Sequence, residues 1–398
     1  MKDIFAKCYE PQLQDELREK GIYPFFHYLE TRQGPEVIME GKRRIMMGSN
    51  NYLGLTSDPE VVEATIEAIR KYGTGCSGSR FLNGTLKIHL ELEKELAEFL
   101  HKDDCMIFPS GFQANLGIVS GVAGLADYVI IDRDVHASIY DGCKLSGSKV
   151  LRFFHNDIED LEKKLQSVPE TAGCLVVADG VYSMSGDIAD LPGICGMAKK
   201  YGARVMLDDA HGLGVLGEGG RGLASHFGLE DQVDIIMGTF SKSLASLGGF
   251  MAADARVIDY TRHISRPFVF AAASAPAQCA SALAALRHIK AHPEEITKLF
   301  DLASLFREEL KKRNVKIKEA PTPIVPIYTY DTERTLRICR RIYDEGVYVN
   351  SVLPPAVPEG QCLIRTSLMA TLTPELIAEA AEIIARVVLE EEAKAAQS

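Results

Sequence analysis

The chain has 398 residues, 46% of them apolar and 25% charged, with a formal net charge of −11. This length predicts a large domain with a smaller one, and the composition is typical of a globular protein. The acidic balance offers no basic stripe and argues against nucleic-acid binding. No apolar run reaches the roughly 18 residues that span a bilayer, and the mixed-charge, helix-like start lacks a signal-peptide core. We therefore expect a cytoplasmic protein with at most peripheral membrane contact.

Residues 46–290 alternate strand-like and helix-like segments. The apolar runs include DYVIIDR, CLVVADG, ARVMLDDAHG and VDIIMGTFSK. DLPGICGMAKKYG, between two of them, indicates a helix with Pro near its start and Gly at its end. Continuous apolar strands separated by helices indicate a mostly parallel sheet covered on both faces, so the expected class is α/β.

Residues 291–398 have a different pattern and predict a small α+β domain. Helical segments, EEITKLFDLASLFREELKKRN, TERTLRICRRIYDEG and the chain after Thr373, alternate with strand-like VKIKEA, PIVPIYTY and CLIRTSLMA. We expect residues 1–45 to pack with this domain and residues 46–290 to form the large one.

Polar side chains follow the predicted strands of the large domain. They are Asp179, Asp208, His211, Thr239, Ser241 and Lys242. In open parallel sheets ligands bind outside the carboxyl ends of the strands, so one pocket is predicted there.

Lys242, in GTFSKSLASLGGF, has hydroxyl residues on both sides. A lysine that forms a Schiff base needs such a fixed, desolvated position, although a loop lysine is the alternative. Asp208 is favoured over Asp209 as the pocket carboxylate because alternate strand residues point to opposite faces. It can pair with a ring nitrogen, and His211 can bond a ring oxygen; a buried structural Asp with a nearby His remains open.

Three further motifs each have a structural alternative. SGFQAN, residues 110–115, suits an anion at a helix N-terminus, or is a simple cap. His136 can stack on an aromatic cofactor, or is structural. Arg365, within an apolar strand, needs a partner, either a substrate carboxylate or a protein carboxylate.

Two other patterns are set aside. GLGVLG, residues 212–217, matches the dinucleotide motif GxGxxG, but it continues into more glycines where that motif requires a helix. The nine cysteines include no CxxC pair, so we expect neither a disulfide framework nor a metal site.

Together these motifs resemble the aspartate-aminotransferase fold and, more narrowly, the α-oxoamine synthases, which depend on pyridoxal 5'-phosphate (PLP). The resemblance covers nearly the whole chain and is carried by NYLGLTSDP, GTGCSGSRFLNGT, SGFQAN, HASIYDG, DGVYSMSGD, LDDAHGLGVLGEGGRG and GTFSKS. Within the group, GTFSKS, SRPFVFAAA and LPPAVPEGQCLIRTSLMATLT are most similar to the bacterial serine palmitoyltransferases.

The resemblance implies a set of site residues. Catalytic roles fall on Lys242, His136, Asp208 and Arg365; cofactor contacts on Gly111, Phe112, Asn115, His136, Ser183, Asp208, His211, Thr239, Ser241, Lys242 and Ser274; substrate contacts on Asn51, His136 and Arg365. It also implies a homodimer with shared active sites, to which Ser274 contributes from the neighbouring subunit.

The implied reaction condenses L-serine with a long-chain acyl-CoA, or an acyl carrier protein thioester, to give 3-ketodihydrosphingosine, CoA and CO2. Some palmitoyltransferases carry an aromatic residue where Asn50 stands, so the same chemistry on cysteate, or on glycine with acetyl-CoA, stays open. An aminotransferase would release no CoA. A non-catalytic partner subunit is disfavoured because the lysine, the aspartate and both histidines are present.

Overall fold

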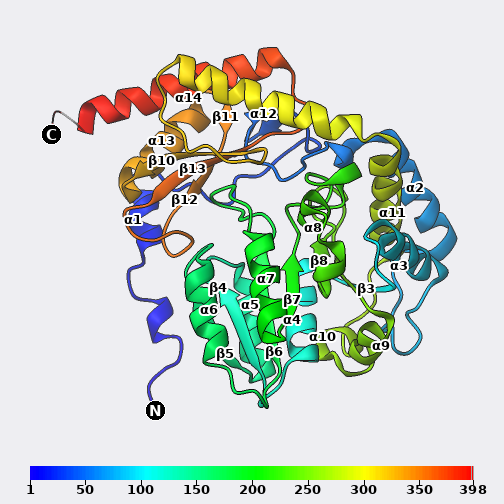
Figure 1. The fold of residues 1–398 in the computed structure, drawn as a ribbon. Coiled ribbons are helices and arrows are strands. Elements are labelled where there is room, and N and C mark those ends of the chain that lie inside the picture. The colour runs from blue at the N-terminus through cyan, green and yellow to red at the C-terminus, as the bar shows by residue number, and fades with distance from the viewer. Residues whose placement is uncertain (396, 398) are drawn as a thin grey trace.

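A seven-stranded sheet forms the centre of the larger part of the computed structural model, which describes residues 1–395 and 397 (Figure 1). In sheet order its strands are β3 (Asp104–Phe108), β9 (Gly249–Ala253), β8 (Ile235–Thr239), β7 (Arg204–Asp208), β6 (Cys174–Asp179), β4 (Tyr128–Asp132) and β5 (Lys149–Phe153). Only β9 runs antiparallel to its neighbours within this described sheet. The expected α/β class with a mostly parallel sheet is confirmed.

Successive strand residues point to opposite sides of this sheet, and helices cover both faces. Val177 belongs to the apolar core under α4 (Gly111–Val122), α5 (Ala137–Ser146), α9 (Ala255–Ile264) and α10 (Arg266–Val269). Its neighbour Val176 belongs to the core of the other face. That face is covered by α3 (Lys87–Phe99), α6 (Ile158–Gln166), α7 (Leu191–Tyr201), α8 (Leu223–Phe227) and α11 (Pro276–Ala291), and α2 (Pro59–Tyr72) packs outside α11.

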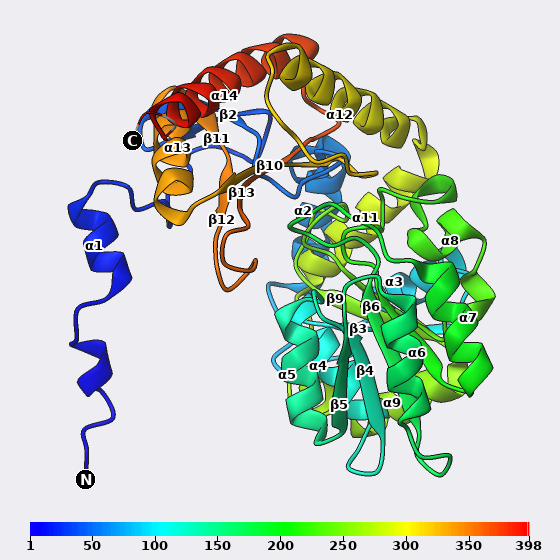
Figure 2. The ribbon, with the colours of Figure 1, turned by 60° about the vertical axis from the view of Figure 1, so that its left-hand side comes forward.

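Two small sheets and three long helices form the second part of the molecule (Figures 1 and 2). The sheets are β1 (Glu36–Met39), β2 (Lys42–Met46) and β11 (Val347–Tyr348), and β10 (Ile324–Tyr330), β13 (Cys362–Ser367) and β12 (Asn350–Val352); the helices are α12 (Glu294–Lys312), α13 (Thr332–Asp344) and α14 (Pro374–Ala395). Because β2 pairs with β11, the chain before residue 47 shares a sheet with residues beyond 346. The predicted boundaries at 45 and 290 stay a prediction, and residues 396 and 398 of the last predicted domain lie outside the described residues.

Two expectations about local structure need correction. The segment VKIKEA, residues 315–320, was expected to be a strand but forms none, because β10 takes β13 as its ladder partner and no ladder reaches this segment. At the start of the chain the α-helix α1 covers only Leu13–Glu19, after Pro11, which has no N–H to donate. No helix within the described residues is long and apolar enough to cross a membrane.

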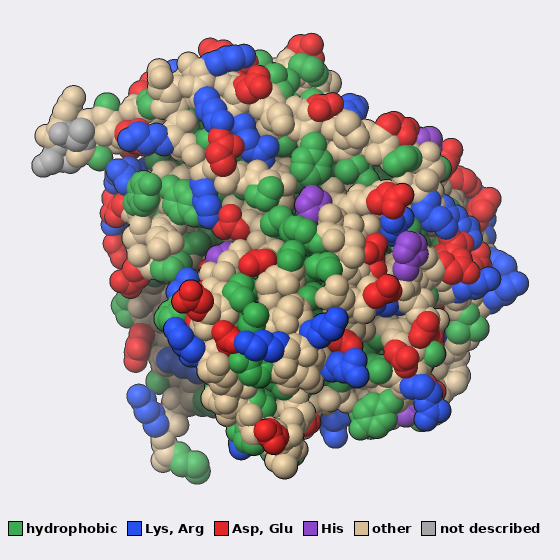
Figure 3. Space-filling view, viewed as in Figure 1, with side chains coloured by type: hydrophobic (Ala, Val, Ile, Leu, Met, Phe, Trp, Pro, Cys, Tyr) green, Lys and Arg blue, Asp and Glu red, His purple; other side chains and the backbone are tan. Residues whose placement is uncertain are grey.

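The carboxyl ends of four neighbouring parallel strands meet at one edge of the large sheet. Their last residues are Asp132, Asp179, Asp208 and Thr239. This edge faces the second part of the molecule in both ribbon views. On the outer surface seen in Figure 3, acidic and basic side chains are interspersed.

Candidate active site

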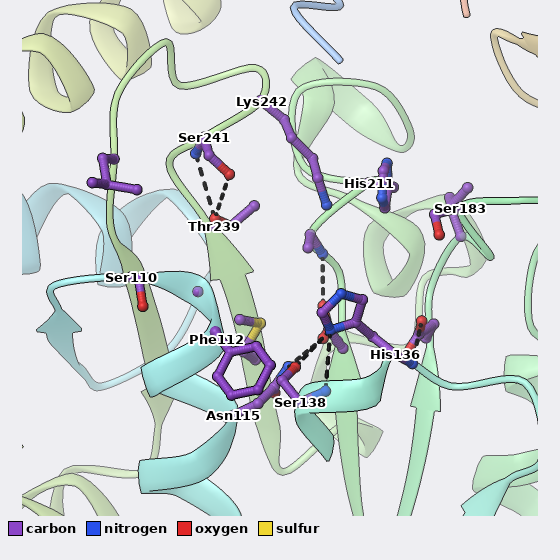
Figure 4. Close-up of a pocket in the computed structure, with 17 residues that line it drawn as sticks. Ser110, Phe112, Asn115, His136, Ser138, Ser183, His211, Thr239, Ser241 and Lys242 are labelled. Atoms are coloured by element: carbon purple, nitrogen blue, oxygen red, sulfur yellow. Dashed lines mark hydrogen bonds between the residues drawn. The ribbon is translucent and has the colours of Figure 1, made fainter. Parts of the chain in front are cut away.

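A cavity of about 250 Å³ opens at this edge of the sheet (Figure 4). Ten residues predicted from the sequence line it: Gly111, Phe112, Asn115, His136, Ser183, Asp208, His211, Thr239, Ser241 and Lys242. Three predicted residues do not line it: Asn51, Ser274 and Arg365. The strand ends and the first turn of α4 therefore bring together residues that are up to 131 positions apart, from Gly111 to Lys242.

A hydrogen-bonded row connects the carboxylate of Asp208 to the imidazole of His136. Asn115 donates from Nδ2 to Asp208 Oδ2 at 2.7 Å and to Ser138 Oγ at 2.9 Å. Ser138 Oγ lies 2.7 Å from His136 Nδ1. Because Asp208 also accepts from the backbone N–H of Ala210 at 3.1 Å, its carboxylate is fixed in the cavity from two sides. Asn115 Oδ1 is buried with no partner.

Asp209, the neighbour of Asp208, faces away from the cavity. Its Oδ2 accepts from the backbone N–H of Leu223 at 2.7 Å, and the side chain is buried among glycines. Burial raises the pKa of Asp209 to about 7. Strand alternation therefore gives the two adjacent carboxylates different surroundings.

Lys242 follows β8 and extends its side chain into the cavity, between Thr239 and Ser241 on one side and His211 on the other (Figure 4). Desolvation lowers the pKa of its amine from 10.5 to about 8, although the charges of Asp208 and Asp179 oppose that shift. An amine with this pKa is about half neutral near pH 8, and the neutral form is the one that acts as a nucleophile or base.

The N-terminus of α4 forms a cradle for an anion beside Thr239. Ser110 caps the helix by accepting from Gln113 N–H at 3.1 Å. A Cβ on Gly111 would lie 2.8 Å from Thr239 Oγ1, so only glycine allows this close approach. Thr239 Oγ1 is in turn 3.0 Å from Ser241 Oγ. Backbone N–H groups and two hydroxyls thus converge on one position, as phosphate binding requires.

Arg365 lies behind the cavity wall and is 4% exposed. Its Nη2 donates to Asn50 Oδ1 at 2.9 Å and to Tyr52 Oη at 3.4 Å, and its Nε donates to the Ser183 carbonyl. Within the described chain these partners, with Ser367 Oγ, are all neutral, and no carboxylate pairs with this guanidinium. A buried cation without a counter-ion is costly, so the position suits an incoming carboxylate.

The comparisons with known proteins agree on one family. The family described as "Aminotransferase class I and II" matches residues 42–384. Serine palmitoyltransferase of Sphingobacterium spiritivorum is 49% identical, with 94% of each chain covered. The chain belongs to the class I and II aminotransferase family and, within it, to the α-oxoamine synthases. The family expected from the sequence is thereby confirmed.

Two more members of this family are similar to the chain. A solved serine palmitoyltransferase with PLP as internal aldimine has a TM-score of 0.95 and 37% identity, covering 98% of this chain and 100% of that one. The 8-amino-7-oxononanoate synthase of Thermosipho melanesiensis is 39% identical, over 91% of this chain and 92% of its own length. Serine palmitoyltransferase of Sphingobacterium spiritivorum, at 49% identity, is thus more similar to the chain in sequence than this synthase.

Three residues of this α-oxoamine synthase were not given a role from the sequence. Asp179 lines the cavity and accepts from the His136 backbone N–H at 3.1 Å; burial and the charge of Asp208 raise its pKa. Tyr52 Oη lies 2.8 Å from His211 Nδ1. Ser138 links Asn115 to His136. Asp179 stands at a predicted strand end and Tyr52 within NYLGL, so position alone was the available signal.

Asn51 and Ser274 lie apart from the cavity of their own chain. The Asn51 side chain is buried and donates to Thr56 Oγ1 at 2.8 Å. Ser274 is also buried, its Oγ has no partner, and its carbonyl contacts His89 Nε2 at 2.9 Å. The expected contribution of Ser274 to a neighbouring subunit stays a prediction.

The cavity fits PLP in the chemistry of its donors. A phosphate matches the cradle at Gly111, Thr239 and Ser241, an acceptor carboxylate is held rigid at Asp208, and Lys242 supplies the amine. Among the described residues, no group of three His, Cys, Asp or Glu side chains is arranged to hold a metal ion.

Proposed function

We propose that this chain is a PLP-dependent acyltransferase that condenses L-serine with a long-chain acyl-CoA to 3-ketodihydrosphingosine, with release of CoA and CO2. The observation that carries this proposal is the meeting of Lys242, Asp208 and His136 in one cavity, beside a helix N-terminus. The similarity to serine palmitoyltransferases over 94% of the chain supports the choice of substrates.

When bound, PLP supplies an electron sink for the negative charge that develops at the α-carbon of the amino acid. We propose that Lys242 holds it covalently and that Gly111, Thr239 and Ser241 bind its phosphate. Asp208, fixed by Asn115, would keep the ring nitrogen protonated.

His211 is prepared to donate a hydrogen bond to the ring oxygen. Its pKa is lowered by burial and by the nearby charges of Lys242 and Arg365, so the imidazole is neutral. Tyr52 Oη accepts from Arg365 and can donate to His211 Nδ1, which places the proton of the imidazole on Nε2. Tyr52 thus selects the donor form of His211.

The chain's own groups would then handle the proton and the carboxylate. Lys242, with a pKa of about 8, can take the α-proton and return it after decarboxylation. Arg365 and His136 would hold the substrate carboxylate until CO2 leaves. Fixing the amino acid in this way would select which bond at the α-carbon breaks first, because its orientation decides which bond is activated.

We further propose that the enzyme is a cytoplasmic homodimer. All nine cysteines are free, as is usual in a reducing compartment. Phe81, Leu82 and Phe270 are large apolar side chains with exposed fractions of 49%, 78% and 78%, a surface that a second subunit can cover. Light scattering on the purified protein tests the assembly: a monomeric mass would contradict it.

The decisive experiment measures free-thiol release from palmitoyl-CoA by the PLP-loaded protein. Serine, cysteate, glycine and alanine are supplied in parallel, and Lys242→Ala is the matched inactive control. We expect release with serine and none from the variant. Release with cysteate instead would retain the mechanism and change the substrate, whereas an inactive protein, or an active Lys242→Ala variant, would overturn the proposal.

A further inference from the structure

A cluster of four charged side chains lies outside the cavity, where the large sheet meets the second part of the molecule. His155 Nδ1 is 3.2 Å from both carboxylate oxygens of Asp132, and His155 Nε2 is 3.8 Å from Asp187 Oδ2. Lys318 Nζ, from the segment before β10, reaches Asp187 Oδ2 at 2.6 Å. Asp187 therefore pairs with one cation from each part of the molecule.

Asp187 closes a small hairpin that extends to the cavity. Tyr182 and Asp187 are joined by the hydrogen bond from Tyr182 N–H to the Asp187 carbonyl at 2.9 Å, and Gly186 N–H donates to the Tyr182 carbonyl at 2.9 Å. The inner side of this hairpin, residues 182–187, carries Ser183, which lines the cavity and whose carbonyl accepts from Arg365 Nε. One short hairpin thus connects the charged cluster to the guanidinium.

The outer side of the hairpin 182–187 is also held tightly. Thr322 Oγ1 donates to the Gly186 carbonyl at 2.9 Å. Gly186 has a φ of +72°, and a Cβ there would lie 3.0 Å from the Cβ of Ala320. The hairpin therefore has little freedom to move as a whole relative to Ala320 and Thr322.

His155 is a cation in this environment. Burial opposes its charge, but pairing with Asp132 and Asp187 outweighs burial and raises the pKa of His155 to about 9. The other groups that face it are the carboxylate of Asp134, on the loop after β4, and the ring edge of Tyr182, with ring centroids 4.2 Å apart. At neutral pH His155 is therefore a cation between the carboxylates of Asp132 and Asp187.

We propose that His155 is a positioning residue for the substrate carboxylate: by pairing with Asp187 it fixes the hairpin 182–187, and thereby the Ser183 carbonyl that orients Arg365. This inference rests on the proposed function, in which Arg365 binds the carboxylate. Without the cation, Asp187 retains Lys318 and Ser185 as side-chain partners, and the Ser183 carbonyl is held less firmly against the guanidinium. Arg365 would then bind the carboxylate less well, without any change in the groups that perform the chemistry.

The test uses His155→Gln and, as a second variant at a half-exposed position, Lys318→Gln. The dissociation constant of L-serine is measured from the absorbance change of the PLP-loaded protein, and kcat from thiol release. We expect His155→Gln to weaken serine binding by about three- to tenfold, because the 3.8 Å contact with Asp187 is an ion pair longer than a hydrogen bond, with kcat nearly unchanged. Lys318→Gln should act in the same direction. His292→Gln, an exposed histidine just after α11, is the control and should leave both quantities unchanged.

Two readouts separate positioning from a merely structural role. The ratio of serine dissociation constants between His155→Gln and wild type should fall toward one above about pH 9, because wild type then loses the same charge. Amide hydrogen exchange at Tyr182 and Gly186 should accelerate in the variant even without PLP. Equal serine affinity in both variants and wild type would refute the positioning role alone. A wild-type protein that responds to no amino acid would refute the proposed function, and this inference with it.

Discussion

Replacing Lys242 with methionine should make the protein without PLP more stable, although it removes the essential amine. Burial lowers the pKa of this amine from 10.5 to about 8. One pKa unit corresponds to about 1.4 kcal/mol, so the charged form costs up to about 3.4 kcal/mol on folding. Because the side chain keeps some solvent contact, we expect a gain of about 2–3 kcal/mol near pH 7 for Lys242→Met.

The sign of the pH dependence follows from proton binding. Between pH 8 and 10.5 the unfolded chain holds a proton that the folded protein has released, so wild-type stability rises with pH in this window. The advantage of Lys242→Met should therefore be complete below pH 8 and vanish near pH 10.5.

Urea unfolding of the two apoproteins at several pH values measures this difference in the free energy of unfolding. Thermal unfolding near neutral pH should show a gain of about 3 °C in Tm. Lys144→Met is the matched control, since Lys144 is 77% exposed and its change should stay within about 0.5 kcal/mol at every pH. A Lys242→Met protein that is less stable than wild type, or whose advantage does not depend on pH, would show that the buried amine is not penalised.

Three other substitutions test the remaining parts of the site. Asp208→Asn keeps a hydrogen-bond acceptor for Asn115 but removes the charge, so thiol release should fall about 10²- to 10³-fold while the melting temperature changes little. Arg365→Lys loses the planar fork of donors and should raise the KM for serine roughly 10- to 100-fold in steady-state assays. Tyr52→Phe removes the hydrogen bond that selects the tautomer of His211, and it should lower kcat/KM and destabilise the protein by about 1 kcal/mol, measured by urea unfolding.

The fold was predictable from the sequence where local pattern decides it. Valine-rich runs such as CLVVADG and ARVMLDD are strands β6 and β7, and Pro192 and Gly202 bound α7 as their backbone preferences require. Residues 315–320 have a strand-like pattern but form none, because a strand also needs a partner ladder, which the local pattern cannot reveal. Propensity predicts an element only when tertiary structure supplies its neighbour.

The candidate site was predictable in the same limited sense. Residues at strand ends converge because all parallel strands of a sheet end at one edge, so Asp208 and Lys242 were found from pattern alone. Contacts between distant segments were not: 159 positions separate Tyr52 from His211, and Lys318 meets Asp187 across 131 positions. Such pairs depend on contacts between segments far apart in the chain, which no periodicity encodes.

The same side chains explain both the cost and the chemistry of this site. Burial disfavours the charged forms of Lys242, Asp179 and His211, and Arg365 has no counter-ion in the described chain. A protein selected for stability alone would replace such groups with apolar ones. A ligand that brings a phosphate to the α4 N-terminus and a carboxylate to Arg365 supplies the charges that this cavity lacks. Binding should therefore relieve the electrostatic penalty that these buried groups impose on the folded protein.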